Sequence, residues 1–568
     1  MINRADALVA LADEQFDVVV VGGGITGAGV ALDAAARGYS VALVERADFS
    51  AGTSSRSSKL VHGGLRYLQN FDLGLVREAL LERQLMVALA PHLVHPLPLV
   101  VAAFQGARPD RLTGVGLNLY DVMAVERLRG WSRHPRARRG RPAVGPLERD
   151  FSEWSPERHR TISGEEVLEL VPALERRAPT SGYLFYDCQT DDARLVLTVL
   201  GEAERFGTVC ANRLDVFELV RDDAGRAAGV KVRDAAGGGE FVVRASNVVN
   251  ATGVWADRLR PEELHDEAEV PRIRPSRGTH ITVRHEDLPL AGGGAIVPAG
   301  GGRSIFALPW LGRTLLGTTD NDYAGELDGV HHVAPSDEDI AYLLDATNEY
   351  FGTALGPQDL TGAYAGVRPL ITTGDPKKSV DISRKAELYE TSSGMVTITG
   401  GKLTTWRRMA KLAVDRLVER EARDAPCRTH EIPLGAPVDV AELPHVDGVP
   451  QASYAALANR YGHAAHDVLA VARERGELAQ PIVPGLPDLL AETTFAVRRE
   501  QARTIGDVLL RRTRLGLLAG RDLDPGGLAV RHVGAALASE LGWDERELGA
   551  QLEAWHAEAR AEGVVGSA

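Results

Sequence analysis

A short apolar segment that leads into a glycine-rich turn near the N-terminus constrains the fold more than any other feature. Residues 17–21 (DVVVV) are apolar and mostly β-branched, as in buried parallel strands, and GGGITG follows at residues 22–27. A helix is expected over residues 28–37, ended by Gly38, and a second strand over residues 40–44. This order of elements predicts the βαβ unit of a Rossmann-like, dinucleotide-binding α/β domain.

The glycines of this turn have separate expected roles. Gly22 permits the tight turn, Gly24 lets the backbone approach a pyrophosphate, and Gly27 lets helix and strand pack closely. The helix N-terminus favours phosphate, and Glu45 lies where a carboxylate can accept hydrogen bonds from an adenosine ribose. The predicted dinucleotide contacts here are Gly22, Gly24, Ile25, Thr26, Gly27, Glu45 and Arg46. The unit alone does not distinguish NAD from FAD.

A second strand-and-turn segment, NVVNATG at residues 247–253, supports the same site. It follows an expected hairpin with strands at residues 229–232 and 241–244. Small residues at the carboxyl end of a strand let backbone approach a dinucleotide, which makes Ala251 and Gly253 further candidate contacts. The distance along the chain predicts a dinucleotide domain that is split by insertions.

Chain length and charge limit the remaining possibilities. A chain of 568 residues is expected to form two or three domains. Its net charge of −14 disfavours nucleic acid as a partner, since phosphate backbones attract basic surfaces. The three cysteines are widely spaced and predict neither disulfides nor a metal site. We find neither a signal peptide nor an apolar segment long enough to span a bilayer, and we expect a cytoplasmic protein.

Several longer motifs resemble FAD-dependent glycerol-3-phosphate dehydrogenases, within the wider group that contains D-amino-acid and glycine oxidases. They are AGTSSRSSKLVHGGLRY (residues 51–67), YDCQTDDARL (186–195), LPW (308–310), GTTD (317–320), AGVRPL (365–370) and TGGKLTTW (399–406). The resemblance implies bound FAD, glycerol 3-phosphate as substrate, and an FAD-binding Rossmann-like domain with an inserted mixed-sheet substrate domain. A small helical domain is expected to close the chain.

The expected domain boundaries follow from composition and periodicity. Residues 1–428 form the FAD- and substrate-binding region, and residues 429–452, rich in Pro, Gly, Val and Asp, form a linker. Residues 453–568 form the C-terminal helical domain, with helices expected over residues 454–472, 488–498 and 533–540. We assign this domain packing, oligomer contact or membrane approach, and no catalytic residue.

Two further segments supply the expected flavin contacts. In the first, residues 51–67, hydroxyl groups can donate hydrogen bonds to the pyrophosphate or the flavin ring, and Lys59 can offset negative charge. The resemblance places His62 of the same segment beside the isoalloxazine. The second segment, residues 399–406, leads into a helix expected over residues 403 to about 418. The N-terminus of this helix can stabilise negative charge on the reduced flavin. The candidate contacts are Thr53, Ser54, Ser57, Ser58, Lys59, His62, Gly401, Lys402, Leu403 and Thr404.

Substrate binding and proton transfer call for cations and a base. Arg368, Arg384 and Lys402 are the candidate phosphate ligands, because guanidinium groups match phosphate oxygens in a bidentate way. Removal of a hydride from C2 also requires a group that takes the hydroxyl proton. His280, before an expected strand at residues 281–283, and His62 are both candidates, and Arg277 can stabilise the developing alkoxide. The candidate catalytic residues are His280, His62 and Arg368.

The electron acceptor is left open by the sequence. A membrane quinone is expected, which would place the protein at the inner face of the cell membrane; an oxidase that reduces O₂ to H₂O₂ is the alternative. An amino-acid oxidase and a flavin protein without turnover are less favoured. Residues 92–172 are expected to be irregular, and their Arg-rich stretch at 127–141 is interpreted as a solvated loop or a contact with anionic lipid. A homo-oligomer is compatible with these features.

Overall fold

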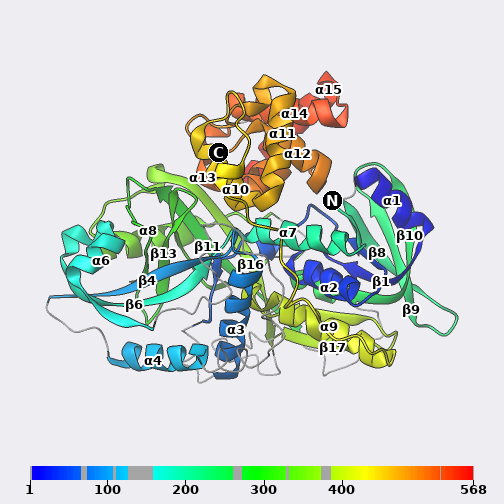
Figure 1. The fold of residues 1–568 in the computed structure, drawn as a ribbon, viewed down its shortest axis with the longest axis horizontal. Helices are drawn as coiled ribbons and strands as arrows, with labels where there is room; N and C mark the ends of the chain where they lie inside the picture. The colour runs from blue at the N-terminus through cyan, green and yellow to red at the C-terminus, as the bar shows by residue number, and fades with distance from the viewer. Residues whose placement is uncertain are drawn as a thin grey trace.

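The computed structural model describes residues 3–64, 73–105, 111–125, 158–259, 272–325, 327, 332–372, 386–524 and 526–566. Two β-sheets lie side by side, and a group of helices formed by the C-terminal part of the chain sits above them in the view of Figure 1. The predicted architecture, an FAD-type α/β domain with an inserted mixed sheet and a C-terminal helical region, is confirmed.

The first sheet is the dinucleotide-type sheet and has eight strands in the described residues. Its main order is β17-β18-β10-β1-β2-β7, and β8 and β9 extend it as a meander from β10. Strand β1 runs parallel to both β2 and β10. The strands are β1 Gln15–Val21, β2 Val41–Val44, β7 Val209–Ala211, β8 Leu214–Arg221, β9 Ala227–Asp234, β10 Gly239–Asn250, β17 Ala386–Glu390 and β18 Val396–Gly400.

Three helices cover one face of this sheet. They are α2 (Ile25–Ala36), α7 (Asp192–Arg205) and α9 (Trp406–Arg420), and their apolar sides share one core with β1 and β2. The nearly continuous apolar sequence of β1 fits its position, because its valines are buried on both faces. On the other side of the sheet, α1 (Arg4–Asp13) packs with the meander strands in a second core.

The second sheet is mixed and has ten strands in the described residues. Its order is β15-β11-β14-β13-β12-β4-β6-β3, with β16 paired to β11 and β5 paired to β6. Strands β12 and β4 are parallel, whereas β11 and β16 form a long antiparallel pair. The strands are β3 Leu60–Val61, β4 His95–Phe104, β5 Arg160–Ser163, β6 Pro179–Gln189, β11 Arg272–Arg284, β12 Gly294–Pro298, β13 Ser304–Trp310, β14 Arg313–Gly317, β15 Asn321–Asp322 and β16 Leu360–Thr372.

Four further helices accompany this part of the chain. They are α3 Leu73–Leu89, α4 Arg111–Val125, α6 Gly164–Leu170 and α8 Asp337–Phe351. Of these, α6 and α8 contribute to the core of the mixed sheet.

The C-terminal helices form a core of their own, to which residues between Leu443 and Val564 contribute. They are α10 Gln451–Tyr461, α11 Ala465–Glu474, α12 Leu490–Glu500, α13 Leu515–Leu518, α14 Leu528–Leu541 and α15 Glu545–Glu562, with a π-helical segment at Asp507–Arg512. In the predicted linker, Ile432 and Leu434 pack on the core of the dinucleotide sheet, whereas Leu443 and Val446 pack on the helical core. None of the helices within the described ranges has the length and apolar character needed to cross a bilayer.

Some local predictions differ from the structure. Residues 92–172 were expected to be irregular, but they contain the ten-residue strand β4 as well as α4, β5 and α6. Two prolines hid the strand pattern of β4, HPLPLVVAAF. The expected hairpin strand at 241–244 and the strand before residue 251 are one continuous strand, β10. The Arg-rich residues 127–141 lie outside the described residues.

Candidate functional site

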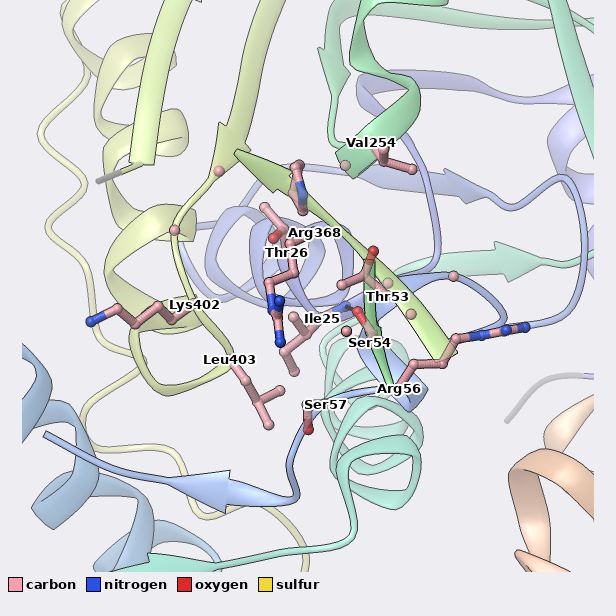
Figure 2. Close-up of a pocket in the computed structure, with 18 of the residues that line it drawn as sticks. Ile25, Thr26, Thr53, Ser54, Arg56, Ser57, Val254, Arg368, Lys402 and Leu403 are labelled. Atoms are coloured by element: carbon pink, nitrogen blue, oxygen red, sulfur yellow. Dashed lines mark hydrogen bonds between the residues drawn. The ribbon is translucent and has the colours of Figure 1, made fainter. Parts of the chain in front are cut away.

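A cavity of about 690 Å³ lies between the two sheets and collects most of the predicted site residues. This volume falls in the range of about 300–1,000 Å³ that is typical of small-molecule and cofactor sites. Its wall includes the glycine turn after β1, the loop at residues 51–58, the turn after β10, and the turn at residues 399–404. Figure 2 shows side chains from these segments around one space.

The glycine turn is held by close backbone contacts. Gly22 has a φ of +113°, and a Cβ atom there would lie 2.7 Å from the carbonyl oxygen of Ala251. A Cβ atom at Gly27 would lie 1.8 Å from the carbonyl oxygen of Gly22. Gly24 is the N-cap of α2, lines the cavity, and supplies no side chain that would cap the helix. The turn therefore places the N-terminus of α2 at the wall of a space that accepts a ligand.

Glu45 lies at the carboxyl end of β2 and lines the same cavity. Its carboxylate accepts hydrogen bonds from the backbone N–H groups of Gly23, at 2.6 Å, and Ala47, at 2.8 Å. Burial raises the pKa of Glu45, although these two N–H groups act in the opposite direction. Next to it, the guanidinium of Arg46 lies 5.0 Å from the ring centroid of Trp255, which also lines the cavity.

The loop at residues 51–58 connects the two sheets. Ser54 Oγ accepts a hydrogen bond from the N–H of Ile25 at 2.9 Å, and Thr53 Oγ1 donates to the carbonyl of Val367 on β16 at 2.6 Å. The loop thereby joins the dinucleotide turn to the mixed sheet. On the opposite wall, Thr404 Oγ1 contacts both the N–H and the carbonyl of His62, at 3.1 and 3.2 Å. Gly401, Lys402 and Leu403 line the cavity beside it. Figure 2 shows the ammonium of Lys402 extending away from the other labelled side chains.

Arg368 reaches the cavity from β16. Its guanidinium donates to the carboxylate of Asp320 at 3.0 Å and to the hydroxyl of Thr318 at 3.0 Å. The side chain is 28% exposed, and all three residues line the cavity. The cation is thus held in place while part of it remains accessible to a ligand.

His280 lies on β11, opposite Tyr364 of β16, and is 2% exposed. Its Nε2 is 2.8 Å from Ser58 Oγ, and its Nδ1 is enclosed without a hydrogen-bond partner in the described residues. Burial, followed by the charges of Lys59 and Arg368, lowers the pKa of His280 well below 6.5. The imidazole is therefore neutral at physiological pH and able to accept a proton.

Among the predicted residues that the structure describes, Gly27, Lys59 and Arg277 do not line the cavity. The ammonium of Lys59 is fully buried against Asp192, at 2.8 Å, and does not line the cavity. Arg277 points to the other side of β11, where it contacts Ser336 at 2.9 Å and Asp339 at 3.2 Å. Its position does not support the expected contact with substrate. Arg384 lies outside the described residues.

Other lining residues were not predicted as part of the site. Asp320 and Thr318 were noticed only as members of a motif, and Arg56 and Trp255 were not singled out. Tyr364 does not line the cavity, but it stacks on His280 and was missed as well. The alternation of side chains along a strand could have predicted Tyr364, because residues 364, 366 and 368 share one face of β16.

Comparison with known proteins agrees with this geometry. Residues 17–416 match the family model described as FAD dependent oxidoreductase, and residues 396–548 match the C-terminal domain of alpha-glycerophosphate oxidase. Glycerol-3-phosphate dehydrogenase 1 of Mycobacterium tuberculosis is 38% identical over 531 residues, which cover 91% of this chain and 94% of the relative. The chain belongs to the FAD-dependent glycerol-3-phosphate dehydrogenase family.

Other members of this dehydrogenase family support the assignment. The mitochondrial glycerol-3-phosphate dehydrogenase SDP6 of Arabidopsis thaliana is 35% identical, covering 96% of this chain and 86% of the relative. The crystal structure of glycerol-3-phosphate dehydrogenase from Bacillus halodurans, solved in complex with FAD, matches with a TM-score of 0.73 and 27% identity, over 99% of this chain and 97% of that one.

The residues of this family member fit FAD, and the prediction of this cofactor is confirmed at the level of the family. The glycine turn leaves room for a pyrophosphate where a side chain would fill it, and α2 offers its N-terminus there. Glu45 would provide an acceptor for ribose hydroxyls, and the hydroxyl of Ser54, which accepts a hydrogen bond from Ile25, would provide a donor. These groups would hold the adenosine and diphosphate, and the turn at residues 400–404 would face the ring.

Proposed function

We propose that this protein oxidises sn-glycerol 3-phosphate to dihydroxyacetone phosphate and passes the electrons to a membrane quinone. One observation carries the proposal: Arg368 and His280 line the same cavity as the glycine turn, from two strands that pair directly. A cation for an anionic ester and a neutral base thus meet beside the expected position of the flavin. When bound, FAD supplies the acceptor for the hydride that leaves C2.

The side chains supply binding and proton transfer. Arg368 binds the phosphate group, and each charged hydrogen bond contributes about 1.5–3 kcal/mol. Asp320 and Thr318 hold its guanidinium in position. As the hydride leaves C2, the hydroxyl proton passes to His280 at Nε2, the nitrogen that contacts the cavity-lining Ser58.

The choice of substrate can be tested directly. Glycerol 3-phosphate, glycerol, lactate and glycine are compared with a soluble dye as the electron acceptor. The phosphorylated alcohol is expected to be oxidised with a kcat/KM at least about 100-fold above that of glycerol, since glycerol lacks the charged group that Arg368 binds. Equal rates with glycerol, or a preference for an amino acid, would overturn the proposed substrate.

Molecular oxygen is the second candidate electron acceptor. It is supported by the match of residues 396–548 to the C-terminal domain of alpha-glycerophosphate oxidase. The two acceptors are separated by measuring anaerobic turnover with a quinone analogue and aerobic release of H₂O₂. The proposal predicts fast quinone reduction and little peroxide. Peroxide formed in step with substrate, and no quinone reduction, would assign an oxidase.

We further propose that the protein works at the inner face of the cell membrane, where a quinone is accessible. The support is the basic composition of residues 127–141, since basic clusters are attracted to anionic lipid. Sedimentation with vesicles of anionic and of neutral lipid tests this proposal. Binding to anionic vesicles that weakens with salt is expected, and equal recovery in the supernatant for both vesicles would contradict it.

A further inference from the structure

A buried ionic contact joins the C-terminal helical domain to the loop beside the cavity. Arg514 lies between the π-helical segment Asp507–Arg512 and α13, and it is 1% exposed. Its guanidinium donates to the carboxylate of Asp192 at 3.0 Å and to the carbonyl of Ser55 at 2.8 Å. One side chain of the helical domain therefore touches both the start of α7 and the cavity loop.

Asp192 in turn holds the segment at residues 57–59. Its carboxylate accepts hydrogen bonds from the N–H of Ser57 at 2.9 Å, from the hydroxyl of Ser57 at 2.7 Å, and from the ammonium of Lys59 at 2.8 Å. Lys59 has a φ of +60°, which residues with side chains adopt at a cost in free energy. The contacts with Asp192 hold the segment in this conformation.

The electrostatics of the cluster depend on both cations. Burial raises the pKa of Asp192, but the charges of Lys59 and Arg514 outweigh it and hold the pKa below its ordinary value. Burial and the charge of Arg514 lower the pKa of Lys59 to about 7. A buried carboxylate that loses one of its cations is left partly uncompensated, which is costly in a low-dielectric interior.

The segment at residues 57–59 leads directly to His280. Ser58 Oγ is 2.8 Å from His280 Nε2, and the hydroxyl of Tyr364 donates to the carbonyl of Ser57 at 2.7 Å. Tyr364 also stacks on the imidazole of His280. Ser58 is thus part of the segment that Asp192 holds, and Tyr364 is anchored to that segment by a hydrogen bond.

We propose that Arg514, acting through Asp192, is a positioning residue that sets the place of Ser58 and thereby of His280. The inference rests on the proposed role of His280 in the reaction. It gives the C-terminal helical domain a part in turnover beyond packing, because Arg514 contacts the carboxylate that holds this segment.

The test compares Arg514→Met with a matched control, Arg213→Met. Arg213 also forms an ion pair between the two regions, with Asp507 at 2.6 Å, and it has a φ of +60° where Arg514 has +65°. Its guanidinium contacts Asp507 and Thr504, away from the segment at residues 57–59. Arg514→Lys keeps a cation but loses the forked guanidinium, and it decides the test if Arg514→Met does not fold.

Two readouts are measured. The first is hydrogen exchange of the peptide covering residues 53–60 in the FAD-loaded protein, which needs no turnover. The second is kcat and KM for glycerol 3-phosphate with a soluble dye. For Arg514→Met we expect faster exchange in this peptide and a kcat lowered about 10- to 100-fold, with a smaller change in KM, because small misplacements at a reacting centre are costly in rate. Arg514→Lys is expected to show the same changes at smaller size.

The inference is overturned if Arg514→Met, or Arg514→Lys in its place, matches Arg213→Met in both the exchange of this peptide and kcat. A failure of the proposed function itself would give a different result. If glycerol 3-phosphate does not reduce the wild-type protein, the substrate is wrong, and the exchange comparison still decides whether Arg514 holds the segment.

Discussion

The imidazole of His280 lies flat on the ring of Tyr364, with centroids 4.8 Å apart and planes at 6° to each other. The two residues face each other on paired strands β11 and β16, and Tyr364 is itself fixed by a hydrogen bond to Ser57. Stacking fixes the plane of the imidazole, while Ser58 fixes its Nε2 edge. A base held in this way needs little rearrangement when it takes a proton.

Replacing the two cavity histidines in turn identifies the base. His280→Ala is expected to lower kcat about 100- to 10,000-fold, the usual contribution of a positioned general base. His62→Ala is expected to have a smaller effect on kcat, because His280 is the imidazole that Ser58 and the stacked Tyr364 hold in place. Rapid-mixing reduction of the bound flavin measures the step. A larger loss for His62→Ala would move the role of base to His62.

The pH dependence of kcat/KM follows from the charges near His280. Its pKa is lowered by burial, by Lys59 and by Arg368, so the acid limb of the profile is expected below pH 6.5. Lys59→Met removes one cation, which raises the pKa of His280 and moves the limb to higher pH. Lys231→Met, which breaks an exposed pair with Glu218, is the control and should leave it unchanged. A limb that stays in place or moves to lower pH in Lys59→Met would contradict this account.

Arg368→Ala should weaken substrate binding while FAD stays bound. Loss of one charged hydrogen bond of about 1.5–3 kcal/mol corresponds to a rise in KM of about 10- to 100-fold. Arg277→Ala gives the contrast, since Arg277 lies on the paired strand but faces Ser336 and Asp339. Steady-state kinetics at constant FAD occupancy measure both. A normal KM for Arg368→Ala, or a larger rise for Arg277→Ala, would place the phosphate elsewhere.

Local signals predicted the dinucleotide part of the site. The turn at Gly22, Gly24 and Gly27 and the acid Glu45 are close in sequence, so strand, helix and turn patterns were sufficient. The partners of the catalytic region are distant instead: Ser58 and His280 are 222 residues apart. Such pairs depend on how strands of the second sheet meet, which no local pattern contains.

Two expected roles changed for identifiable reasons. The strand containing His280 was expected to start at residue 281, but β11 starts at Arg272, so Arg277 is part of it. Residues three apart in a strand point to opposite faces, and His280 and Arg277 therefore could not both face the cavity. The expected role of Lys59 in flavin binding was inferred from its neighbours in sequence, whereas its ion-pair partner Asp192 lies 133 residues away. Burial of this pair was not visible in the sequence.

Gly24→Val is expected to give protein without FAD. A Cβ atom at Gly24 would already lie 3.0 Å from Ser54 Oγ, and the branched side chain would occupy space where the pyrophosphate is expected. Gly201→Ala on α7, where a Cβ atom meets nothing within 4 Å, is the matched control and should stay yellow. The ratio of absorbance at the flavin band to that at 280 nm reports the occupancy. A fully loaded Gly24→Val protein would refute this placement of the diphosphate.

The most direct measurement is the visible spectrum of the purified protein without oxygen, before and after glycerol 3-phosphate is added. The account predicts a yellow protein whose flavin band bleaches on addition of glycerol 3-phosphate, and not on addition of glycerol at the same concentration. A colourless protein supplied with FAD, or a flavin band that glycerol 3-phosphate leaves unchanged, would contradict it.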